Sequence, residues 1–587
     1  MEEKKVLLSI KDLVVKFHVR GRILTAIRGI SLDIYENESI AIVGESGSGK
    51  SVFTKTFAGM LDSNGFIDSG DIIFNDDELA DTLVPVNDKV RATLSRIEDR
   101  LNRASKLELG AATYQKIMAL KKEKELKGTL SEEESEAIDT KIADLRFERT
   151  ELFNMKQTLD PSNEKAKIKE TGARIDAMDK EIKALEKKKE ELVKEHLHAL
   201  RNDTQYNAEY DSKMKVLKAQ YDEEIAGEVP QAVKDRNAVV AKEIYLSKER
   251  VSTTKKRITT ERLIRAVKKA MEIGVDLDDE VQRNSVFDAV TLRVKYLEEV
   301  DDPEKGKCLH GYCVINSAKI KSEAEWTRIR GRRIATVFQD PMTSLNPIIP
   351  IGKQITSIIM KHQDVSEVEA RNRAIVLMKK VGIPNAEKRF DDYPFEYSGG
   401  MRQRIVIAIA LSCQPKILIC DEPTTALDVT IQAQILQLLK DLQKDLGFTI
   451  VFITHDLGVV ANIADRVAVL YAGEVIEMGS VEEVFYDPRH PYTWALLSSL
   501  PQLAERNTEL YSITGTPPSL YNKIVGDPFA PRNPYCMKID TIIEPPMFKI
   551  TDTHYAKTWL EDPRSPQVEK PAVLKDIHTK LLSTLNL

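Results

Sequence analysis

Residues 44–51 read Gly-Glu-Ser-Gly-Ser-Gly-Lys-Ser and fill every fixed position of the phosphate-binding pattern G-x-x-x-x-G-K-[ST]. The apolar residues 39–43 before them predict a buried strand, and residues 52–58 after them predict a helix. Glycines in such a loop let backbone N–H groups and the helix N-terminus point at an anion. An ordinary turn of glycine and serine is the alternative, and the complete pattern argues against it. We therefore predict a nucleoside triphosphate site.

The whole loop is expected to contact the nucleotide, so the candidate binding residues are Gly44, Glu45, Ser46, Gly47, Ser48, Gly49, Lys50 and Ser51. In this pattern the lysine reaches the β- and γ-phosphates, which assigns that role to Lys50. The hydroxyl of Ser51 is expected to occupy one ligand position on Mg²⁺.

Composition and charge exclude several classes of protein. The 587 residues suffice for more than one domain, and 42% hydrophobic with 30% charged residues is typical of a soluble protein. A net charge of −6 gives no argument for a nucleic-acid partner. The sequence has no apolar run of transmembrane length and no signal-peptide pattern, and its five scattered cysteines favour a reducing compartment. We expect a cytoplasmic protein that reaches a membrane only through partners.

Apolar segments on both sides of a long charged stretch predict an α/β fold. Half-buried strands are expected at residues 13–17, 30–34 and 70–75. Further strands are expected at residues 334–338, 417–420 and 449–453, with a hairpin at residues 467–477 around Ala472 and Gly473. A helical stretch at residues 431–446 lies between two of these strands, as in a right-handed β–α–β crossover of a parallel sheet.

Residues 81–320 are predicted to form a charged helical insertion. Two apolar stripes with heptad-like spacing flank a turn at residues 160–163: Ile138, Ile142, Leu145, Leu152 and Leu159 before it, and Ile168, Ile175, Met178, Ile182, Leu185 and Leu192 after it, interrupted by Lys189. They predict an antiparallel, partly coiled-coil hairpin with arms of ~35 residues that reach ~50 Å. A single solvated helix or partial disorder is the alternative. Further helices are expected at residues 258–267 and 281–297.

Residues 416–420 predict a buried strand that ends in the two acids Asp421 and Glu422. A carboxylate at that position suits a Mg²⁺ site beside the phosphate loop, which makes Asp421 a candidate metal residue. The adjacent Glu422 is then placed to orient or deprotonate the attacking water. Strands often end in solvated acids, so this pair indicates a metal site only in combination with the phosphate loop.

A second candidate anion site follows Tyr397. Ser398-Gly399-Gly400-Met401 precedes a helix at residues 405–411, where a helix N-terminus with free N–H groups favours an anion. An ordinary glycine-rich helix start is the alternative for this segment alone. Two phosphate sites far apart in one chain predict a head-to-tail dimer that sandwiches each nucleotide between two partners.

Together these motifs resemble those of the ATP-binding-cassette ATPases. Residues 398–401 match the family signature, with Tyr397 where leucine is usual, and Gln339 matches the Q-loop. Residues 426–428 match the D-loop, and His455 matches the switch histidine. The resemblance implies a phosphate-loop core with an N-terminal antiparallel β subdomain and a helical signature subdomain. It also implies that ATP and Mg²⁺ are the ligands.

The resemblance assigns roles to four further residues. Gln339 is implied to sense Mg²⁺ and the membrane subunit, and His455 to contact the γ-phosphate. Asp428 is implied to signal across the dimer. An aromatic residue near the N-terminus normally stacks on adenine, and Phe17 is our choice for it. The expected catalytic set is therefore Glu422, His455 and Gln339.

The similarity extends to one group within the family. Residues 338–347, 398–404 and 424–434 resemble the D-type ATPase of oligopeptide and dipeptide importers, and residues 490–493 and 515–519 are further marks of it. The F-type partner usually has glutamine where Met401 stands. The resemblance implies a heterodimer with an F-type ATP-binding subunit, two polytopic permease subunits, an extracellular peptide-binding protein reached through the complex, and no nucleic acid. It places the chain peripherally on the cytoplasmic face of the membrane.

Two cysteine-containing segments are not expected to bind metal. Many relatives have a C-terminal cysteine cluster, but here Asp527, Asn533 and Asp540 stand in its place and Cys536 is alone. A cluster needs four ligands, so we predict no iron–sulfur centre. Residues 308–313 offer three soft ligands, whereas structural zinc needs four. We predict a turn there.

The predicted segments are the N-terminal cassette part with the phosphate loop (1–80), the insertion (81–320), the rest of the cassette (321–485), an importer-type segment (486–550) and a tail (551–587). A dipeptide or nickel importer ATPase is an alternative. A chromosome-structure or DNA-repair ATPase is another, but there the coil typically follows the Q-loop, whereas this insertion precedes Gln339. A translation-associated ATPase normally has two cassettes, and this chain has one.

Overall fold

The structure, a computed structural model, describes residues 4–19, 22–131, 134–135, 137–139, 141–142, 145, 148–149, 152, 165–251, 253–287, 292–321, 323–425, 427–499, 513, 515–521, 524–571 and 574. Leu159, the turn predicted at residues 160–163, Ala426 of the D-loop motif and the tail from residue 575 lie outside the described residues. The chain divides into two compact units, Met1–Asp81 with Cys313–Leu587, and Thr82–Tyr312.

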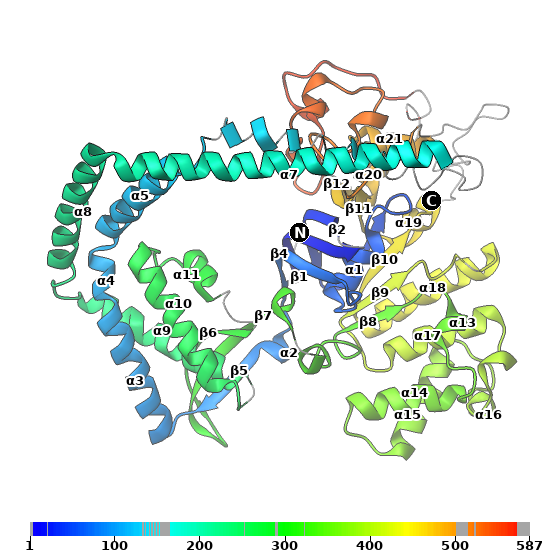
Figure 1. The fold of residues 1–587 in the computed structure, drawn as a ribbon. Helices are drawn as coiled ribbons and strands as arrows, with labels where there is room; N and C mark the ends of the chain where they lie inside the picture. The colour runs from blue at the N-terminus through cyan, green and yellow to red at the C-terminus, as the bar shows by residue number, and fades with distance from the viewer. Residues whose placement is uncertain are drawn as a thin grey trace. The chain divides into compact units, whose positions relative to one another are not determined.

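The first unit contains a sheet of eight strands in the order β13-β14-β12-β11-β3-β10-β9-β8. Its strands are β3 (Ser39–Val43), β8 (Ile334–Val337), β9 (Ile417–Asp421), β10 (Thr449–Thr454), β11 (Arg466–Tyr471), β12 (Glu474–Ser480), β13 (Phe548–Lys549) and β14 (Tyr555–Ala556). The five strands from β11 to β8 run parallel, and β12 pairs antiparallel with β11 as the predicted hairpin requires. β3 and β10 are buried along their whole length, which explains their largely apolar sequences. The predicted α/β fold is confirmed (Figure 1).

An antiparallel sheet accompanies the parallel one. β1 (Val6–Val19) pairs with β2 (Arg22–Tyr35) on one side and with β4 (Gly65–Phe74) on the other. β4 also pairs with the end of β7 (Gly306–Asn316) through Ile73 and Asn316. In β1 the side chains alternate between buried and more exposed positions over much of the strand, because one face of the sheet packs into the core. The predicted N-terminal antiparallel subdomain is thus present.

Helices pack against the parallel sheet, and several of them share an apolar core with it. They are α1 (Lys50–Phe57), α13 (Pro341–Ser344), α14 (Ile351–His362), α15 (Glu367–Lys380), α16 (Ala386–Arg389), α17 (Gly399–Leu411), α18 (Val429–Leu446) and α19 (Leu457–Ile463). α13 to α17 gather beside the β8 end of the sheet (Figure 1). The core joins Ile355 of α14, Ile407 of α17 and Leu439 of α18 to Phe452 of β10. This arrangement corresponds to the predicted helical signature subdomain.

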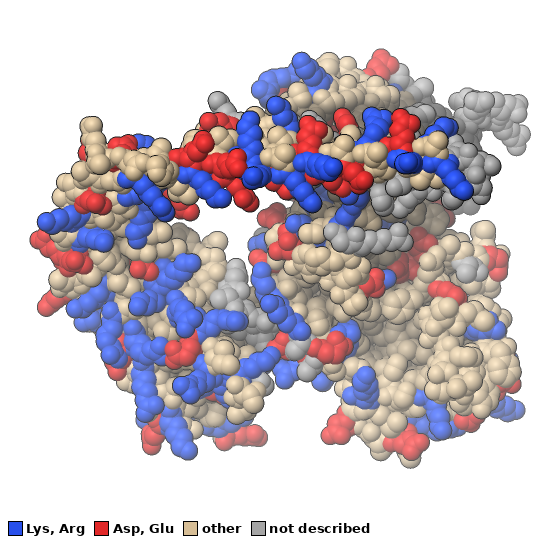
Figure 2. Space-filling view, in the orientation of Figure 1, with Lys and Arg blue, Asp and Glu red and all other residues tan. Residues whose placement is uncertain are grey.

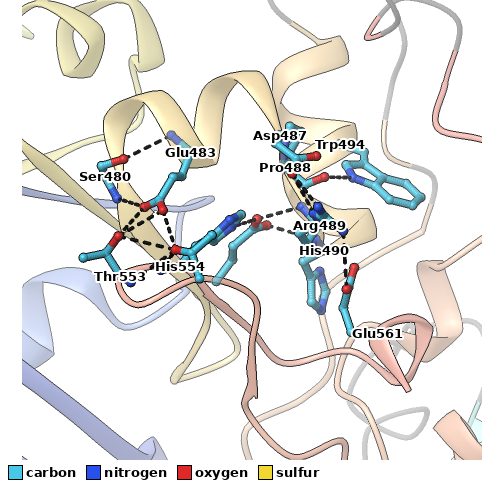
Figure 3. A network of polar contacts seen from close by, with 12 residues as sticks. Ser480, Glu483, Asp487, Pro488, Arg489, His490, Trp494, Thr553, His554 and Glu561 are labelled. Carbon is cyan, nitrogen blue, oxygen red and sulfur yellow. Dashed lines mark hydrogen bonds and ion pairs between the residues drawn. The ribbon is translucent and has the colours of Figure 1, made fainter. Parts of the chain in front are cut away.

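The start of the importer-type segment contacts strand β12 of the sheet. After α20 (Val481–Tyr486) and α21 (Pro491–Ser498), the chain returns to add β14 beside β12. The buried carboxylate of Glu477 on β12 accepts hydrogen bonds from the backbone N–H groups of Arg489 and His490, and lies 2.9 Å from His554 Nε2. Figure 3 shows this network of polar contacts between the start of α21 and the returning chain. Burial lowers the pKa of His490 to about 3 and keeps it neutral.

In its described residues, the second unit combines helices with three strands and has a core of its own. Its elements are β5 (Asp81–Pro85), α3 (Asp88–Ala104), α4 (Lys106–Leu109), α5 (Ala111–Lys127), α7 (Lys165–Asn202), α8 (Thr204–Glu224), α9 (Gln231–Glu249), α10 (Lys256–Ile273), α11 (Glu280–Phe287), β6 (Leu292–Asp302) and β7. Ile244 of α9, Val267 of α10, Val294 of β6 and Leu309 of β7 are buried. The helix predicted at residues 258–267 is confirmed.

Two predictions within this unit are wrong. Residues 292–297, expected as the end of a helix, belong to β6, and the turn expected at residues 308–313 is part of β7. In β7 the side chains from Leu309 to Ile315 alternate between buried and half-buried, which is the period of a strand. A Cβ on Gly311 would come within 2.6 Å of Val294, so that glycine permits close packing and does not mark a turn. Cys308 and Cys313 are both buried on this strand.

The helix α7 contains 38 residues, and its surface carries alternating basic and acidic side chains (Figure 2). Two ion pairs join it to the preceding segment. Arg149 Nε lies 2.5 Å from Asp179 Oδ1, and Lys189 Nζ lies 2.6 Å from Asp139 Oδ1. From the first ion pair to the second, the residue number rises from 139 to 149 in the preceding segment and falls from 189 to 179 in α7. The two segments therefore run in opposite directions.

Candidate active site

The predicted site residues converge at one edge of the parallel sheet. The phosphate loop follows β3, and Asp421 is the last residue of β9. Gln339 lies two residues after the end of β8, and His455 lies one residue after the end of β10. These four strands are parallel neighbours in the sheet, so their carboxyl ends lie side by side. This edge is where open α/β sheets bind ligands.

The glycines of the loop are required by its backbone. Gly44 has φ 153°, and a Cβ there would lie 2.2 Å from the Leu470 carbonyl oxygen of β11. Gly49 has φ 102° and precedes the first residue of α1. Gly47 has φ 82° with open space around its Cβ position. The loop therefore bends in a way that L-residues with side chains disfavour.

Lys50 turns back over the loop. Its Nζ donates hydrogen bonds to the carbonyl oxygens of Gly44 at 2.7 Å and of Glu45 at 2.9 Å. Burial lowers the pKa of Lys50, while the carboxylates of Glu422, Asp421 and Glu45 oppose that shift. A buried cation next to a glycine-rich loop at a helix N-terminus is suited to the charge of a triphosphate. The buried hydroxyl of Ser48 has no hydrogen-bond partner among the described residues, which leaves it available to a ligand.

Ser51 and Asp421 form a pair of oxygen ligands at the base of the loop. The Ser51 hydroxyl donates to Asp421 Oδ1 at 3.3 Å. Burial raises the pKa of Asp421, and the neighbouring charge of Glu422 adds to the shift. A hydroxyl and a carboxylate beside a phosphate loop are the hard ligands that Mg²⁺ prefers, so these residues fit that ion.

Glu422 lies at the centre of the site with a φ of 46°. Its Oε2 accepts hydrogen bonds from Gln339 Nε2 at 3.0 Å and from the Thr425 hydroxyl at 3.2 Å. Its Oε1 lies 3.1 Å from His455 Nδ1. The structure thus brings together the three residues of the expected catalytic set. A carboxylate held in this way can orient or deprotonate a water molecule.

The signature residues lie in the helical layer and not in this cluster. The Ser398 hydroxyl caps α17 by accepting from the Met401 N–H at 3.4 Å. Gly400 lies against α18, where a Cβ would come within 2.7 Å of Ile431. Asp428 caps α18 through the Ile431 N–H at 3.0 Å. The signature and the D-loop residue Asp428 therefore lie close together, at the starts of two helices that pack against each other.

Phe17 lies in the interior of the antiparallel sheet. Only 8% of its surface is exposed, and a Cβ on Gly65 would lie 2.6 Å from its ring. The ring has little free face in this structure, and its contact with adenine stays a prediction.

Sequence reasoning missed three residues that contact the loop and the site. Thr425 supports Glu422, and Tyr492 and Arg532 both bind Glu45. Tyr492 lies in the segment 490–493 that marks the importer group, but no local pattern links it or Arg532 to a loop more than 440 residues earlier.

A phosphate loop, an acidic strand end, a glutamine and a histidine on neighbouring parallel strands define a phosphate-loop ATPase. The chain belongs to the ABC transporter family, whose model matches residues 27–256 and 293–425. A second model, "Oligopeptide/dipeptide transporter, C-terminal region", matches residues 476–539. No helix in the described part of the chain is both long and apolar enough to span a membrane.

Three curated relatives are similar to part of the chain. The oligopeptide transport ATP-binding protein AmiE of Streptococcus pneumoniae is 64% identical over 262 residues, 45% of this chain and 74% of that protein. OppD of Bacillus subtilis, also an oligopeptide transport ATP-binding protein, is 59% identical over 45% of this chain and 74% of its own length. The dipeptide transport ATP-binding protein DppD of Lactococcus lactis is 58% identical over 42% of this chain and 71% of its own length.

Proposed function

We propose that this chain is the ATP-hydrolysing subunit of an oligopeptide importer. The observation that carries the proposal is the position of Glu422, held between Gln339 and His455 at the edge where Lys50 and Ser51 also lie. The similarity to oligopeptide transport ATP-binding proteins supplies the cargo class. The similarity to a dipeptide transport protein makes dipeptides the second candidate.

ATP binds along the loop from Gly44 to Ser51 in this proposal. The backbone N–H groups and Lys50 take up the charge of the phosphates, and Phe17 is proposed to contact the adenine. Ser51, Asp421 and Gln339 hold Mg²⁺, directly or through water. When bound, the ion supplies neutralisation of charge on the β- and γ-phosphates. Glu422 acts as the general base, and its orientation is supported by Gln339 and Thr425. His455 contacts the γ-phosphate.

The productive site requires a second ATP-binding subunit. The separation of residues 398–401 from the loop supports a dimer in which the signature of each subunit faces the nucleotide of the other. We propose an F-type subunit as the partner, with Asp428 next to the partner's site. Binding of ATP then closes the dimer, and hydrolysis reopens it.

The membrane partners are proposed to dock beside Gln339. Phe338, Met342, Ile348 and Ile349 are large apolar side chains exposed within a short segment around this residue. Such a cluster favours a protein contact. We assign it to the two permease subunits, which places the chain peripherally on the cytoplasmic face of the membrane. An extracellular peptide-binding protein acts through the same complex, and no nucleic acid is involved.

The insertion is proposed to carry an antiparallel, partly coiled-coil arm. The ion pairs Arg149–Asp179 and Lys189–Asp139 support the opposite direction of its two segments. On α7 the side chains of Ile175 and Ile182, one heptad apart, are buried. We propose the segment boundaries near residues 80 and 320, where the compact units change at 81–82 and 312–313.

The importer-type segment is proposed to function without an iron–sulfur centre. Asp527 and Asp540 are buried there, and Cys536 is exposed with no second cysteine in the segment. The described residues contain no group of three or more His, Cys, Asp or Glu side chains arranged to hold a metal ion. Stoichiometric iron in the purified protein would contradict this part of the proposal.

Affinity purification of the tagged full-length chain from detergent-solubilised membranes tests the function. The expected result is co-purification of a second ATP-binding subunit and two polytopic membrane proteins, with ATPase activity that oligopeptides stimulate in the presence of their binding protein. Stimulation by dipeptides alone would favour the second cargo. Purification without membrane proteins, together with ATPase activity stimulated by DNA, would contradict the proposal and favour a DNA-repair enzyme.

A further inference from the structure

The phosphate loop is held by residues that follow it by more than 440 positions. The backbone N–H of Glu45 donates to the Tyr492 hydroxyl at 2.8 Å, and Glu45 Oε1 accepts from Arg532 Nη1 at 2.7 Å. Tyr492 and Arg532 both lie in the stretch matched by the transporter C-terminal model. We propose that Arg532 is a positioning residue of the ATP site, which acts through Glu45, so that this C-terminal segment completes the phosphate loop. The inference rests on the proposed function.

Arg532 packs against a cluster of buried aromatic side chains. Tyr471, Tyr492 and Phe529 are fully buried, with ring centroids 4.7 to 5.4 Å apart. The Arg532 guanidinium donates to the Tyr471 hydroxyl at 3.1 Å and lies 5.7 Å from the centre of that ring. Packed aromatic side chains lose little further freedom when a ligand binds. The guanidinium is therefore fixed before the nucleotide arrives.

β11, which carries Tyr471, and the turn after it also contact the backbone of the phosphate loop. The Leu470 carbonyl, next to Tyr471, abuts Gly44, and the Gly473 N–H donates to the Ser48 carbonyl at 2.9 Å. The loop is thus supported by the end of β11 and by the turn that follows it. Glu45 adds a third point of attachment. Its backbone N–H binds Tyr492 and its side chain binds Arg532, so both parts of the residue join the loop to the C-terminal segment.

The charge of Arg532 has a direct consequence for the nucleotide. The Glu45 carboxylate is close enough to act on Lys50, the cation that neutralises the phosphates. The ion pair is largely removed from water, since the Arg532 side chain is 6% and the Glu45 side chain 23% exposed. Without Arg532, an uncompensated carboxylate would face the incoming triphosphate and compete for Lys50. Arg532 therefore compensates a negative charge within the loop.

Binding of a fluorescent ATP analogue with Mg²⁺ to the full-length chain tests the inference. Arg532→Gln is expected to weaken binding roughly tenfold, because it leaves the Glu45 carboxylate unpaired. The double variant Glu45→Gln with Arg532→Gln removes that charge and is expected to restore affinity to within about threefold of wild type. Arg532→Lys keeps the charge and is expected to recover most of the binding. Arg564→Gln, the same change on an exposed arginine further along the chain, should have no effect.

The outcomes separate the inference from the function on which it rests. If wild-type protein fails to bind the analogue, the proposed function is wrong. Wild-type binding with unchanged affinity in Arg532→Gln would overturn the inference alone. A loss in Arg532→Gln that the double variant does not restore, with a lowered thermal midpoint in both, would show only structural support and would also overturn it. The thermal midpoint of every variant is therefore measured alongside its affinity.

Discussion

Gln339 Nε2 donates a hydrogen bond to Glu422 Oε2 at 3.0 Å, although the two residues follow different strands. The other carboxylate oxygen of Glu422 lies 3.1 Å from His455 Nδ1. Since β8, β9 and β10 are parallel neighbours, the glutamine and the histidine flank the glutamate from both sides. The orientation of Glu422 therefore depends on the residues after the two adjoining strands.

Replacement of Gln339 by alanine is expected to reduce kcat for ATP roughly two- to tenfold in the assembled complex, because Glu422 loses one of its hydrogen bonds. KM for ATP should change less than kcat, since the loop and Lys50 are untouched and Ser51 and Asp421, the other two residues proposed to hold Mg²⁺, remain. Steady-state ATPase kinetics measure both constants. A large rise in KM at constant kcat would show that Gln339 serves binding and not the orientation of Glu422.

Replacement of Gly44 by alanine is expected to destabilise the protein more than replacement of Gly29. Both glycines have positive φ, but a Cβ on Gly44 would lie 2.2 Å from the Leu470 carbonyl oxygen, whereas a Cβ on Gly29 meets open space. The backbone strain alone costs about 1–2 kcal/mol at either position. Thermal denaturation should therefore place the Gly44→Ala midpoint several degrees below that of Gly29→Ala. Equal midpoints would contradict the close approach of loop and β11.

Asp527 is expected to make stability depend on pH. Burial raises its pKa to about 7, with its Oδ1 bound to the Phe529 N–H and with Asp540, Glu474 and Lys557 acting on it electrostatically. The folded state holds the proton more tightly than the unfolded state, so this contribution is full below about pH 4 and is lost as the pH rises toward 7.

Asp527→Asn does not titrate and should remove that loss. Between pH 5 and pH 7 its stability is expected to fall less than that of wild type, by up to about 1.4 kcal/mol per pH unit. Chemical denaturation of both proteins across this range measures the difference, and the other titrating groups cancel in it. Parallel stability curves would show that Asp527 titrates as an ordinary carboxyl.

The antiparallel arm can be tested by cross-linking. Cysteines in place of Asp139 and Lys189 are expected to react together with a short bismaleimide, because these residues form an ion pair. The control pair replaces Asp139 and Asp179, which lies ten residues from Lys189 along α7, or ~15 Å. Cys536 is the exposed native cysteine among those described and is changed to serine in both. Equal cross-linking of the two pairs would contradict the register.

Much of the nucleotide site could be predicted from the sequence, because each part is a short local pattern at the end of a strand. Adjacent residues are enough to predict the local structure of the glycine loop and of the apolar strand before Asp421. The parallel order of the strands then brings the patterns together, which the crossover from β9 through α18 to β10 already indicates.

Other features could not be predicted because they depend on distant contacts. Nothing near Arg532 in the sequence points to Glu45, because the two residues are brought together by the tertiary fold. The sequence predicts a helix end and a turn where the structure has β6 and β7, since charged residues and Gly311 obscure the alternation of these strands. At Gly311 the strand lies so close to Leu246 and Val294 that a Cβ would clash with both, which no local sequence pattern indicates.

Glu422 is proposed to be the general base with which this chain hydrolyses ATP. Glu422→Gln keeps the size of the side chain and removes the charge that accepts a proton. In the assembled complex the variant is expected to bind ATP with wild-type affinity and to lose at least ~100-fold in hydrolysis rate. Undiminished hydrolysis by the Glu422→Gln complex would contradict the claim.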